Sequence, residues 1–475
     1  MHNFNSLTET LTQIVGPKNL STDPSTLRHY NSDWSRTEGD SSELVLFPTS
    51  EDQICKVMTV CSGQGIPVVP SGGRTGLAAG AQGGPGQVII SLEKMTKILS
   101  VDPVNMSIEA QAGATTAQLQ MAAEEAGLFF PIDLAAKGSC QIGGNIATNA
   151  GGLRFVRFGG TREQVLGLRV VLANGECLDL NKALRKNNTG YDLKQLFIGS
   201  EGTLGIITQA TLCLTPKPRA TNVCFLGLES IEKMLTLFSK TRRQALGLTA
   251  FEWIDRRSLD LVLSVNPDLR DPFDQPCDHD ALMEVETPGD TSDQSQSGFL
   301  EGFLEPLFES GDLSDALIAG STEQERDLWA LREHITESLV ATGHVRKNDI
   351  SLPLSGLCNF YQQFSKIRSS LPGDLSLMAF GHIGDGNLHI NYHGSKAIPT
   401  LEFYKKTRDI ELEIYQLTAS LNGSISAEHG IGLLKKHDLS FSRSPQELSL
   451  MRGIKSLIDP KNLLNPGKIL NPVDS

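Results

Sequence analysis

The stretch Ile66-Pro67-Val68-Val69-Pro70-Ser71-Gly72-Gly73-Arg74-Thr75-Gly76 decides how the fold is interpreted. Residues 66–69 are mostly apolar and predict a short strand, which leads directly into the glycine-containing loop at 70–76. A glycine loop after a strand lets backbone N–H groups turn towards one point, which suits a phosphate or pyrophosphate. Taken alone, the loop favours a plain turn. The chain has neither of the common fingerprints G-x-G-x-x-G and G-x-x-x-x-G-K-[ST].

A second group of small residues favours a cofactor-binding loop over a plain turn. Residues 138–145 (GSCQIGGN) are followed closely by residues 148–152 (TNAGG), so two loops of glycines and amides occur in one region. Two such loops suggest a long, flat, phosphate-bearing cofactor laid against the backbone. The surrounding patterns predict helices over 51–62 and 116–126 and strands over 88–92, 98–101 and 107–110, the first helix opening with a Ser50–Gln53 capping box.

A pair of histidines marks a second functional region. The apolar run 375–380 and the alternating run 388–392 predict two strands, and the Asp-Gly pair at 385–386 predicts a hairpin turn between them. Folded in this way, His382 at the end of the first strand comes close to His389 near the start of the second.

The hairpin also suggests a metal site. Asn391 shares a face with His389, because strand side chains alternate with period two. Glu428, in the later stretch 426–432 (SAEHGIG), offers a third ligand. Two histidines and one carboxylate suit a catalytic zinc-type site with an open coordination position. The plainer alternative is a pair of polar histidines at strand ends without a metal.

Residues 188–193 (NTGYDL) and 198–208 (IGSEGTLGIIT) are the third marker beside the two glycine loops. These three blocks resemble the FAD-binding domain of the vanillyl-alcohol-oxidase type, and residues 199–208 are close to the signature of that family. With the histidine and Glu428-His429 blocks, nearly the whole chain resembles the FAD-linked D-2-hydroxy-acid dehydrogenases. That group includes the D-lactate, glycolate and D-2-hydroxyglutarate enzymes.

The resemblance implies an α+β protein in three parts. These are a FAD-binding domain of two subdomains over 1–219, an α+β substrate-binding domain with an antiparallel sheet over 220–422, and a small helical C-terminal segment over 423–475 that returns to the flavin. The stretch 215–218 (TPKP) supports the first boundary, because prolines end a strand. Later patterns predict helices over 230–246, 323–341, 431–437 and 445–458, a strand over 281–286 and an exposed loop over 288–297.

For the cofactor, the resemblance implies FAD held by the glycine loops and by a residue of the C-terminal tail. The residues concerned are Pro70, Ser71, Gly72, Gly73, Arg74, Thr75, Gly76, Gly138, Ser139, Gly143, Asn145, Thr148, Asn149, Gly151, Gly205, Ile207 and Asn465. Some members of the wider flavin family attach FAD through a histidine, but only His2 and His29 of the ten histidines precede residue 220. We therefore expect non-covalent FAD, with Cys140 as a small buried thiol rather than a thioether.

Three residues of the second domain form a candidate carboxylate site. Arg332 and Thr336 are four apart on a predicted helix and so project from one face, and Lys347 enters a following strand. A guanidinium, a hydroxyl and an ammonium that converge would hold a carboxylate, whereas the sequence alone favours ordinary surface charge. The resemblance favours the carboxylate, because the D-2-hydroxyglutarate dehydrogenases have these residue types at matching places. Residues 349–353 (DISLP) and 153–159 (LRFVRFG) also look closest to that subgroup.

The resulting hypothesis is oxidation of D-2-hydroxyglutarate, or a similar D-2-hydroxy diacid, to the 2-oxo acid (2-oxoglutarate). A divalent metal on His382, His389 and Glu428, zinc or else manganese, would bind the hydroxyl and C1 carboxylate and lower the hydroxyl pKa. His429 would contact the substrate beside Asn391 and act as general base. FAD would take the hydride. We expect electron-transfer flavoprotein or the quinone pool as acceptor, and a homodimer that is cytoplasmic or peripheral to the inner membrane.

The composition of the chain indicates how many domains it has and argues against some classes of partner. A chain of 475 residues with 39% hydrophobic and 20% charged residues is too long for one core and fits a globular protein of two or three domains. The net charge of -13 argues against nucleic acid and against an anionic membrane surface. Eight cysteines without a C-x-x-C pair favour reduced thiols in the cytosol. We expect no signal peptide and no transmembrane segment.

Three other interpretations remain open. A D-lactate or glycolate dehydrogenase of the same fold would prefer the shorter acid over a five-carbon diacid. An oxidase would pass electrons to dioxygen and yield peroxide. A FAD-binding subunit without turnover is a different class of protein, and the presence of His382, His389, Glu428 and His429 argues against it.

Overall fold

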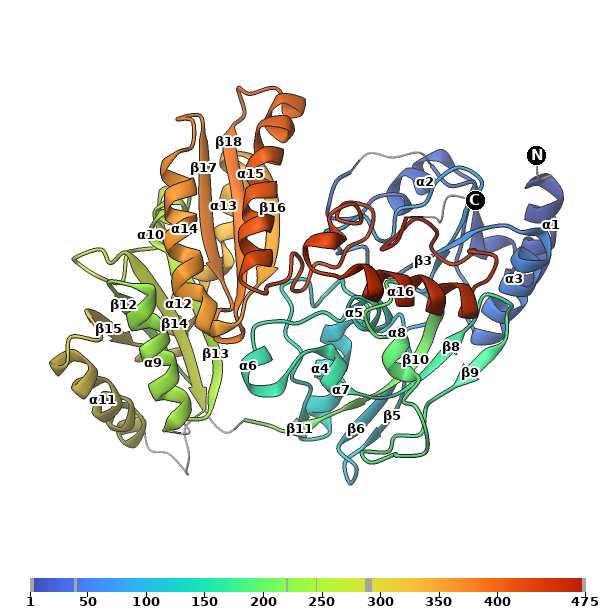
Figure 1. Ribbon diagram of the computed structural model, residues 1–475. Coiled ribbons are helices and arrows are strands. Elements are labelled where there is room, and N and C mark those ends of the chain that lie inside the picture. The colour runs from blue at the N-terminus through green and yellow to red at the C-terminus, as the bar shows by residue number, and fades with distance from the viewer. Residues whose placement is uncertain (1–3, 38–40, 219–220, 245, 287–292, 472–475) are drawn as a thin grey trace. The chain divides into compact units, whose positions relative to one another are not determined.

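The computed structural model describes residues 4–37, 41–218, 221–244, 246–286 and 293–471 (Figure 1). The chain divides into two compact units. Unit 1 comprises Met1–Gly152, Gly159–Lys217 and Glu428–Ser475, and unit 2 comprises Leu153–Phe158 and Pro218–Ala427. The three functional parts expected from the sequence remain a prediction.

Unit 1 contains two larger sheets and a short ribbon among its described residues. The first sheet has the order β1-β2-β4-β3, with β2, β4 and β3 parallel: β1 (Leu20–Ser21), β2 (Leu44–Leu46), β4 (Val88–Ser91) and β3 (Val68–Ser71). The second is antiparallel: β5 (Ile98–Asp102), β6 (Ser107–Gln111), β10 (Ile206–Cys213), β8 (Val165–Val171) and β9 (Cys177–Asp179). The ribbon pairs β7 (Leu128–Phe129) with β11 (Thr215–Pro216).

The helices of unit 1 follow the local sequence signals. They are α1 (Phe4–Val15), α2 (Pro24–Tyr30), α3 (Glu51–Gln64), α4 (Thr116–Glu125), α5 (Ile142–Thr148), α7 (Thr161–Gln164), α8 (Lys194–Phe197) and α16 (Pro445–Ile458). In α3 the Ser50 hydroxyl accepts a hydrogen bond from the Gln53 N–H at 3.3 Å, and Gly65 ends the helix with a φ of 68°. Its apolar residues at helical spacing are buried: Ile54, Val57, Met58 and Cys61. The predicted α3, α4 and α16 are confirmed.

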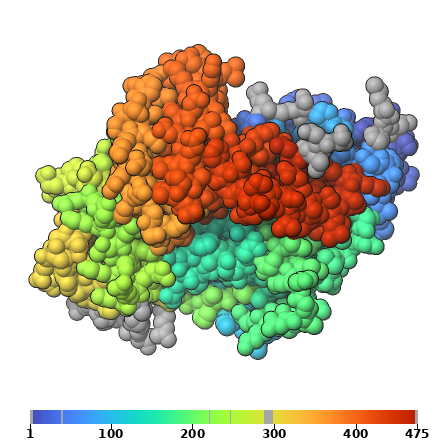
Figure 2. Space-filling model, viewed as in Figure 1, coloured from blue at the N-terminus to red at the C-terminus, as the bar shows by residue number. Residues whose placement is uncertain are grey.

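The C-terminal tail is bound to the first sheet of unit 1. The Val68 N–H donates to the Leu463 carbonyl at 2.7 Å, and the Asn465 N–H donates to the Val68 carbonyl at 2.8 Å. The tail therefore runs alongside β3 as a further, parallel partner. In Figure 2 the red C-terminal residues lie against green ones of the same unit, and Lys455 of α16 donates to the Thr203 carbonyl at 2.7 Å.

Unit 2 is built on a seven-stranded sheet, β15-β12-β14-β13-β17-β18-β16. The strands are β12 (Thr221–Leu228), β13 (Leu248–Asp255), β14 (His279–Glu286), β15 (Asp315–Ile318), β16 (Gly343–Ser351), β17 (Leu375–Gly381) and β18 (Asn387–Ser395). The pairings of the described strands are antiparallel, as expected for this domain.

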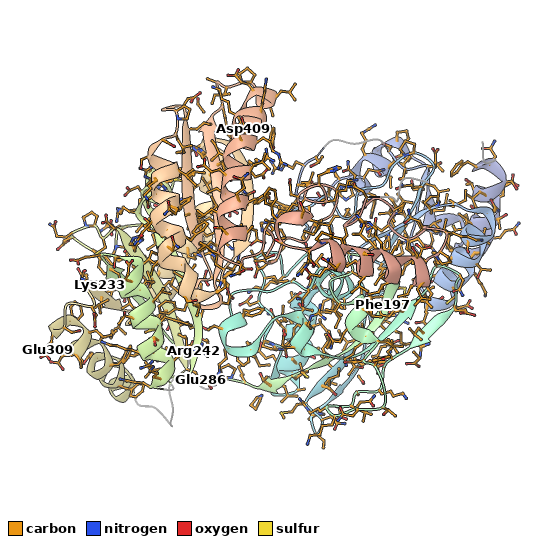
Figure 3. The ribbon with its side chains drawn as sticks, in the orientation of Figure 1. Phe197, Lys233, Arg242, Glu286, Glu309 and Asp409 are labelled. Atoms are coloured by element: carbon orange, nitrogen blue, oxygen red, sulfur yellow. The ribbon has the colours of Figure 1, made fainter. Side chains whose placement is uncertain are left out.

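Helices cover both faces of that sheet. They are α6 (Phe155–Phe158), α9 (Ile231–Arg243), α10 (Arg256–Val265), α11 (Asp293–Glu309), α12 (Thr322–Glu333), α13 (Ile335–Thr342), α14 (Leu357–Ser369) and α15 (Thr400–Ser420). Apolar residues of α10, α12 and α13 share one core with Ile254 and Phe380 of the sheet. On the opposite face, Phe238 of α9 packs against Phe251 of β13, while Arg242 of α9 stays exposed (Figure 3).

The predicted hairpin is confirmed. β17 and β18 are paired and antiparallel, and the turn between them ends at Gly386, whose φ is 81°. A Cβ at Gly386 would lie 2.1 Å from the Leu352 carbonyl, so the turn requires glycine for space as well as for conformation. The rings of His382 and His389 lie with their centroids 5.2 Å apart, as the hairpin predicted.

Several sequence predictions need correction. Residues 431–437 form turns instead of a helix, because the backbone at Gly430 and Gly432 adopts φ values of 76° and 51°. The helix expected over 323–341 is two helices that meet at His334, where ψ is -3°. The strand expected at 66–69 begins at Val68 and ends at Ser71. Within the loop expected over 288–297, residues 293–297 belong to α11, and residues 288–292 lie outside the described residues.

In the described part of the chain, no helix has both the length and the apolar character needed to cross a membrane.

The buried carboxyl group of Asp280 in β14 gives a prediction about stability. Neither of its oxygens has a hydrogen-bond partner among the described residues, and burial raises the pKa of this group to about 8. An unfolded aspartate has a pKa of about 3.9, so the folded protein holds a proton that the unfolded chain releases. Stability from this group is therefore present below pH 4 and is lost as the pH rises to 8.

We expect Asp280→Asn to raise the Tm at pH 8 by more than at pH 5, at roughly 2–4 °C for each kcal/mol gained. Thermal unfolding of both proteins at the two pH values measures the difference. Asp268→Asn, which changes an exposed acid of the same unit, is the matched control. A Tm difference that is the same at both pH values would contradict the assignment.

Candidate functional site

A cavity in unit 1 brings the glycine loops together. Its lining includes most of the predicted cofactor residues: Pro70, Ser71, Gly72, Gly73, Arg74, Thr75, Gly76, Gly143, Asn145, Thr148, Gly151, Gly205 and Ile207. Together with Glu201, Glu428 and His429, apolar residues and a glycine from two further segments complete much of the wall: Leu77, Ala78, Gly80, Ala81, Leu134, Ala135 and Ala136. The cavity therefore joins the loops that the sequence analysis identified with the Glu428-His429 block.

The two glycine loops touch backbone to backbone. A Cβ at Gly73 would lie 2.1 Å from the Ser139 carbonyl oxygen, so a side chain there cannot fit without movement of the opposite backbone. Gly143 of the second loop is crowded by Ala112 instead, whose Cβ would lie 2.6 Å from a Cβ at Gly143. Gly73 is thus required by the approach of the loops, and this approach makes a narrow wall of backbone groups.

The chemistry of this wall fits a phosphate-bearing cofactor. Among the described residues, none accepts a hydrogen bond from the backbone N–H groups of residues 72–76. The buried Ser71 hydroxyl and the Gln141 side-chain oxygen also have no partner in the described structure. A cavity wall of backbone N–H groups that have no acceptor among the described residues suits an anion, so these residues fit the pyrophosphate of FAD.

The remaining predicted cofactor residues lie around this cavity rather than on its lining. The Asn149 side chain accepts from the Arg162 N–H at 3.0 Å, and the Asn465 side chain donates to the carbonyls of Gly80 and Glu201 at 2.9 and 2.7 Å. Gly138 and Ser139 belong to the loop that meets Gly73. Cys140, by contrast, does line the cavity and is buried, with its sulfur 3.2 Å from the Thr116 hydroxyl oxygen.

Glu428 and His429 enter the cavity on a tightly held turn. The Gly152 N–H donates to the Glu428 carboxylate at 3.0 Å, and a Cβ at Gly151 would lie 2.2 Å from the same carboxylate. Beyond His429, the N–H groups of Ile431 and Gly432 donate to the Glu201 carboxylate at 2.7 and 2.8 Å. His429 is thus flanked on both sides by anchored backbone.

In unit 2, a buried carboxylate joins two of the predicted site residues. Glu252 of β13 accepts from the Arg332 Nε at 2.8 Å, and its other oxygen lies 2.6 Å from Nδ1 of His382. Burial alone would raise the pKa of the Glu252 carboxyl, but the charges of His382 and Arg332 outweigh it and hold this pKa at about 2. Glu252 is therefore an anion. The Arg332 guanidinium also lies over the ring of Phe380, 4.4 Å from its centroid.

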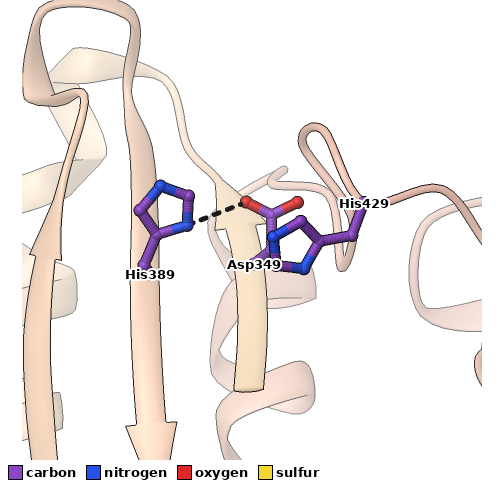
Figure 4. Close-up of side chains that lie close together, drawn as sticks. All are labelled: Asp349, His389 and His429. Atoms are coloured by element: carbon purple, nitrogen blue, oxygen red, sulfur yellow. Dashed lines mark ion pairs between the residues drawn. The ribbon is translucent and has the colours of Figure 1, made fainter. Parts of the chain in front are cut away.

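His389 is backed by a carboxylate in the same way. Its Nδ1 lies 3.4 Å from the buried carboxylate of Asp349, the residue directly opposite on β16 (Figure 4). Asp349 also accepts from the Asn387 side chain at 2.7 Å and from the Ala427 N–H at 3.0 Å. A carboxylate on Nδ1 fixes the tautomer of a histidine and leaves Nε2 as the ligand atom, an arrangement typical of metal-binding histidines.

The other predicted substrate residues lie on the same face of the sheet or beside it. Lys347 is directly opposite Asn391 in the pairing of β16 with β18, one step along the same face from Asp349 and His389. Asn391 is buried, and its side-chain nitrogen has no partner among the described residues. Thr336 is half-buried in the first turn of α13.

Sequence reasoning missed the three carboxylates that hold these groups. Glu252 stands in the otherwise mostly apolar run 248–254 (LTAFEWI), and a lone charge within a buried strand is a signal that could have identified it. Asp349 lies in the motif 349–353 (DISLP) and Glu201 in the motif 198–208 (IGSEGTLGIIT). No pattern in their neighbouring residues marks either carboxylate as part of a site. Their partners lie 40 or more residues away, at His389 and Ile431.

Two family models match this chain. The FAD binding domain matches residues 42–181, and the C-terminal domain of FAD linked oxidases matches residues 217–469. The second match alone covers more than half of the chain. The chain belongs to the FAD-linked oxidase family. FAD is accordingly its cofactor, and the protein is a FAD-dependent oxidoreductase.

Curated relatives place the chain more finely within this family. The D-2-hydroxyglutarate dehydrogenase of Xanthomonas citri pv. viticola is 42% identical over 98% of this chain and 97% of its own length. The mitochondrial D-2-hydroxyglutarate dehydrogenases of Arabidopsis thaliana and Bos taurus are 40% and 42% identical, each over 96% of this chain and over 80% and 82% of their own lengths. The resemblance to FAD-linked D-2-hydroxy-acid dehydrogenases is confirmed.

Solved structures agree on the fold. A p-cresol methylhydroxylase structure is similar with a TM-score of 0.78 and 17% identity, covering 98% of this chain and 96% of that chain. An alkyldihydroxyacetonephosphate synthase structure gives a TM-score of 0.71 and 17% identity, with coverage of 98% and 85%. These similarities concern the fold alone. The expected α+β class with a vanillyl-alcohol-oxidase type FAD domain is confirmed.

The contact between the glycine loops leads to a prediction about FAD. We expect Gly73→Ala to lose most of its bound FAD, because the new Cβ would collide with the Ser139 carbonyl and push the loops apart. FAD released by acid, measured per chain by its absorbance, gives the result. Gly63→Ala in α3, where a Cβ meets no atom within 4 Å, is the control. Wild-type FAD content in Gly73→Ala would show that the loops do not form the FAD site.

Proposed function

We propose that this protein oxidises D-2-hydroxyglutarate, or a closely similar D-2-hydroxy diacid, to the 2-oxo acid. The observation that carries the proposal is the polar face of the unit 2 sheet. There two histidines, each backed by a buried carboxylate, lie beside a lysine and an amide whose nitrogen has no partner in the described structure: His382, His389, Lys347 and Asn391. The curated relatives named above are D-2-hydroxyglutarate dehydrogenases, which supports the choice of substrate.

The histidine pair is proposed to hold a divalent metal, zinc or manganese, with Glu428 as third ligand. His382 and His389 each turn Nδ1 to a carboxylate, so both Nε2 atoms are left as ligands. Glu428 follows directly after Ala427, whose N–H donates to Asp349 of this cluster. One peptide step is about 3.8 Å, which supports Glu428 as a ligand. A divalent ion held by these side chains would polarise the hydroxyl and C1 carboxylate of the substrate.

The chain's own residues then account for the proton and for the substrate's orientation. His429, at the wall of the FAD cavity, takes the hydroxyl proton on its imidazole, the side chain that most often serves as a general base. The Asn391 amide donates to the substrate, and Lys347 binds its distal carboxylate. The glycine loops of unit 1 would hold FAD, which would supply the acceptor for the hydride from C2.

The remaining parts of the hypothesis stay predictions. FAD is expected to be non-covalent, since the cavity lining contains Cys140 only as a buried thiol that contacts Thr116. Electron-transfer flavoprotein or the quinone pool is the expected acceptor. A homodimer that is cytoplasmic or peripheral to the inner membrane is likewise expected.

Removal of the metal tests the proposed ligands. We expect His382→Ala to lose bound metal and to lower kcat at least about a hundredfold, in line with the loss of a metal-site partner, while FAD content stays at the wild-type level. A chelator should have the same effect on the wild type, and zinc or manganese should restore the rate. Metal content by elemental analysis is measured beside activity, with the exposed His437→Ala as control. Full activity in metal-free protein would refute the metal.

Substrate choice tests Lys347. A charge-assisted hydrogen bond contributes roughly 1.5–3 kcal/mol, so Lys347→Ala should lower kcat/KM for D-2-hydroxyglutarate about ten- to a hundredfold and for D-lactate much less. The exposed Lys366→Ala on α14 is the matched control. Arg332→Ala is expected to affect both acids, because it also removes one of the two charged partners of the buried Glu252 carboxylate and leaves only His382. Equal losses of kcat/KM on the two acids in Lys347→Ala would show that this lysine does not bind the distal carboxylate.

A further inference from the structure

Glu201 connects three segments of unit 1 that are distant in the sequence. Its backbone N–H donates to the Ala147 carbonyl of α5 at 2.7 Å, and its own carbonyl accepts from the Asn465 side chain at 2.7 Å. Its carboxylate reaches a third segment, the turn after His429. Glu201 also borders the FAD cavity.

Both oxygens of the Glu201 carboxylate accept hydrogen bonds from that turn. One accepts from the Ile431 N–H at 2.7 Å and the other from the Gly432 N–H at 2.8 Å. We call these two hydrogen bonds the clamp. Both bonded residues lie within three positions of His429, so only a short piece of backbone separates the imidazole from the clamp. A carboxylate that accepts two backbone N–H groups makes two charge-assisted hydrogen bonds, which are stronger than neutral ones.

The conformation and the close contacts of the turn require glycine at positions 430 and 432. At Gly430, φ is 76° and a Cβ would lie 2.9 Å from the Glu201 carboxylate. At Gly432, φ is 51° and a Cβ would lie 1.9 Å from the Ala78 carbonyl. Positive φ together with this close contact is tolerated by glycine and strained for other residues. The turn is therefore held from two sides, by Glu201 and by the backbone at Ala78.

We propose that Glu201 is a positioning residue for the proton transfer: its carboxylate fixes the 430–432 turn and so holds the imidazole of His429 at the edge of the FAD cavity. The proposal rests on the proposed function, in which His429 takes the hydroxyl proton. A general base has to lie about 2.6–3.2 Å from the proton's donor atom, and a misplacement of about 1 Å can cost a hundredfold in rate. A carboxylate outside the reacting atoms can thus control the rate.

Glu201→Gln tests this with little change in shape. The amide oxygen can still accept from one N–H, but the amide nitrogen is a donor and faces the second N–H, so half of the clamp is lost. The backbone contacts of residue 201 to Ala147 and Asn465 do not depend on its side chain. The variant therefore separates the clamp from the general architecture of the loop.

A double-mutant cycle with His429→Ala gives the decisive measurement. Full-length, FAD-loaded wild type, Glu201→Gln, His429→Ala and the double variant are mixed with D-2-hydroxyglutarate, and the rate of flavin bleaching is followed. We expect Glu201→Gln to lower this rate about ten- to a hundredfold, but to change it less than about twofold once His429 is absent. Equal losses in both backgrounds would overturn the role of Glu201 while leaving His429 as the base. A wild-type rate in His429→Ala would overturn the base and, with it, the positioning role.

Two further variants serve as controls for this measurement. Asp459→Asn weakens a similar clamp elsewhere in unit 1, where the carboxylate accepts from the N–H groups of Leu463 and Leu464 at 3.0 and 2.7 Å. It is expected to lower the Tm but to change the bleaching rate less than Glu201→Gln does, and a loss as large would overturn the specific role of Glu201. Gly430→Ala disturbs the same clamp from the opposite side. If Glu201→Gln does not retain FAD, the cycle is repeated with Gly430→Ala, and additive losses there overturn the proposal equally.

Discussion

The buried charge of Glu252 is the constraint on which the site of unit 2 depends. An ion withdrawn from water is unfavourable unless charged or hydrogen-bonding partners replace the water, and removal of one partner of a buried pair costs about 3–5 kcal/mol. Arg332 and His382 supply those partners. One carboxylate therefore holds the end of α12 against the sheet and contacts Nδ1 of His382, so Nε2 is the ring nitrogen that the proposed metal would use. Glu252 lies on β13, which is buried on both faces of the sheet. The site residues bound to Glu252 are therefore held by the core.

In unit 1 the comparable constraint is the close approach of chain segments, to which the Glu201 carboxylate adds hydrogen bonds. Gly73 lies against Ser139, Gly151 against Glu428, and Gly432 against Ala78, and in each case a Cβ would come within about 2.2 Å of another atom. These glycines are explained by close approach, which brings backbone N–H groups to one cavity without intervening side chains. A phosphate needs such groups. The same close approach secures the turn that carries His429, so the FAD cavity and the proposed general base share one set of close contacts.

The sequence predicted the hairpin of His382 and His389 because its signals are local: alternation with period two and an Asp-Gly turn. It also predicted α3 and α16, whose caps and apolar spacing lie within a few residues. It could not predict the carboxylates behind the histidines, since Glu252 and His382 are 130 residues apart and meet only through the pairing of β13 with β17. The helix expected at 431–437 failed for a related reason. Its local pattern is helical, but contacts with Ala78 and Glu201 impose positive φ at two glycines.

The buried pair also bears on how a diacid is distinguished from a monoacid. The Glu252 contacts of Arg332 use its Nε and one terminal nitrogen, so the guanidinium charge is already compensated by a neighbouring anion. A second anion, such as a substrate carboxylate, gains less from a compensated cation than from one held by neutral groups, because the two anions repel each other across it. Arg332 is therefore suited to orientation through its planar donors. Lys347, which lies further along the same face of the sheet opposite the Asn391 amide, is the cation that the proposed function assigns to the distal carboxylate.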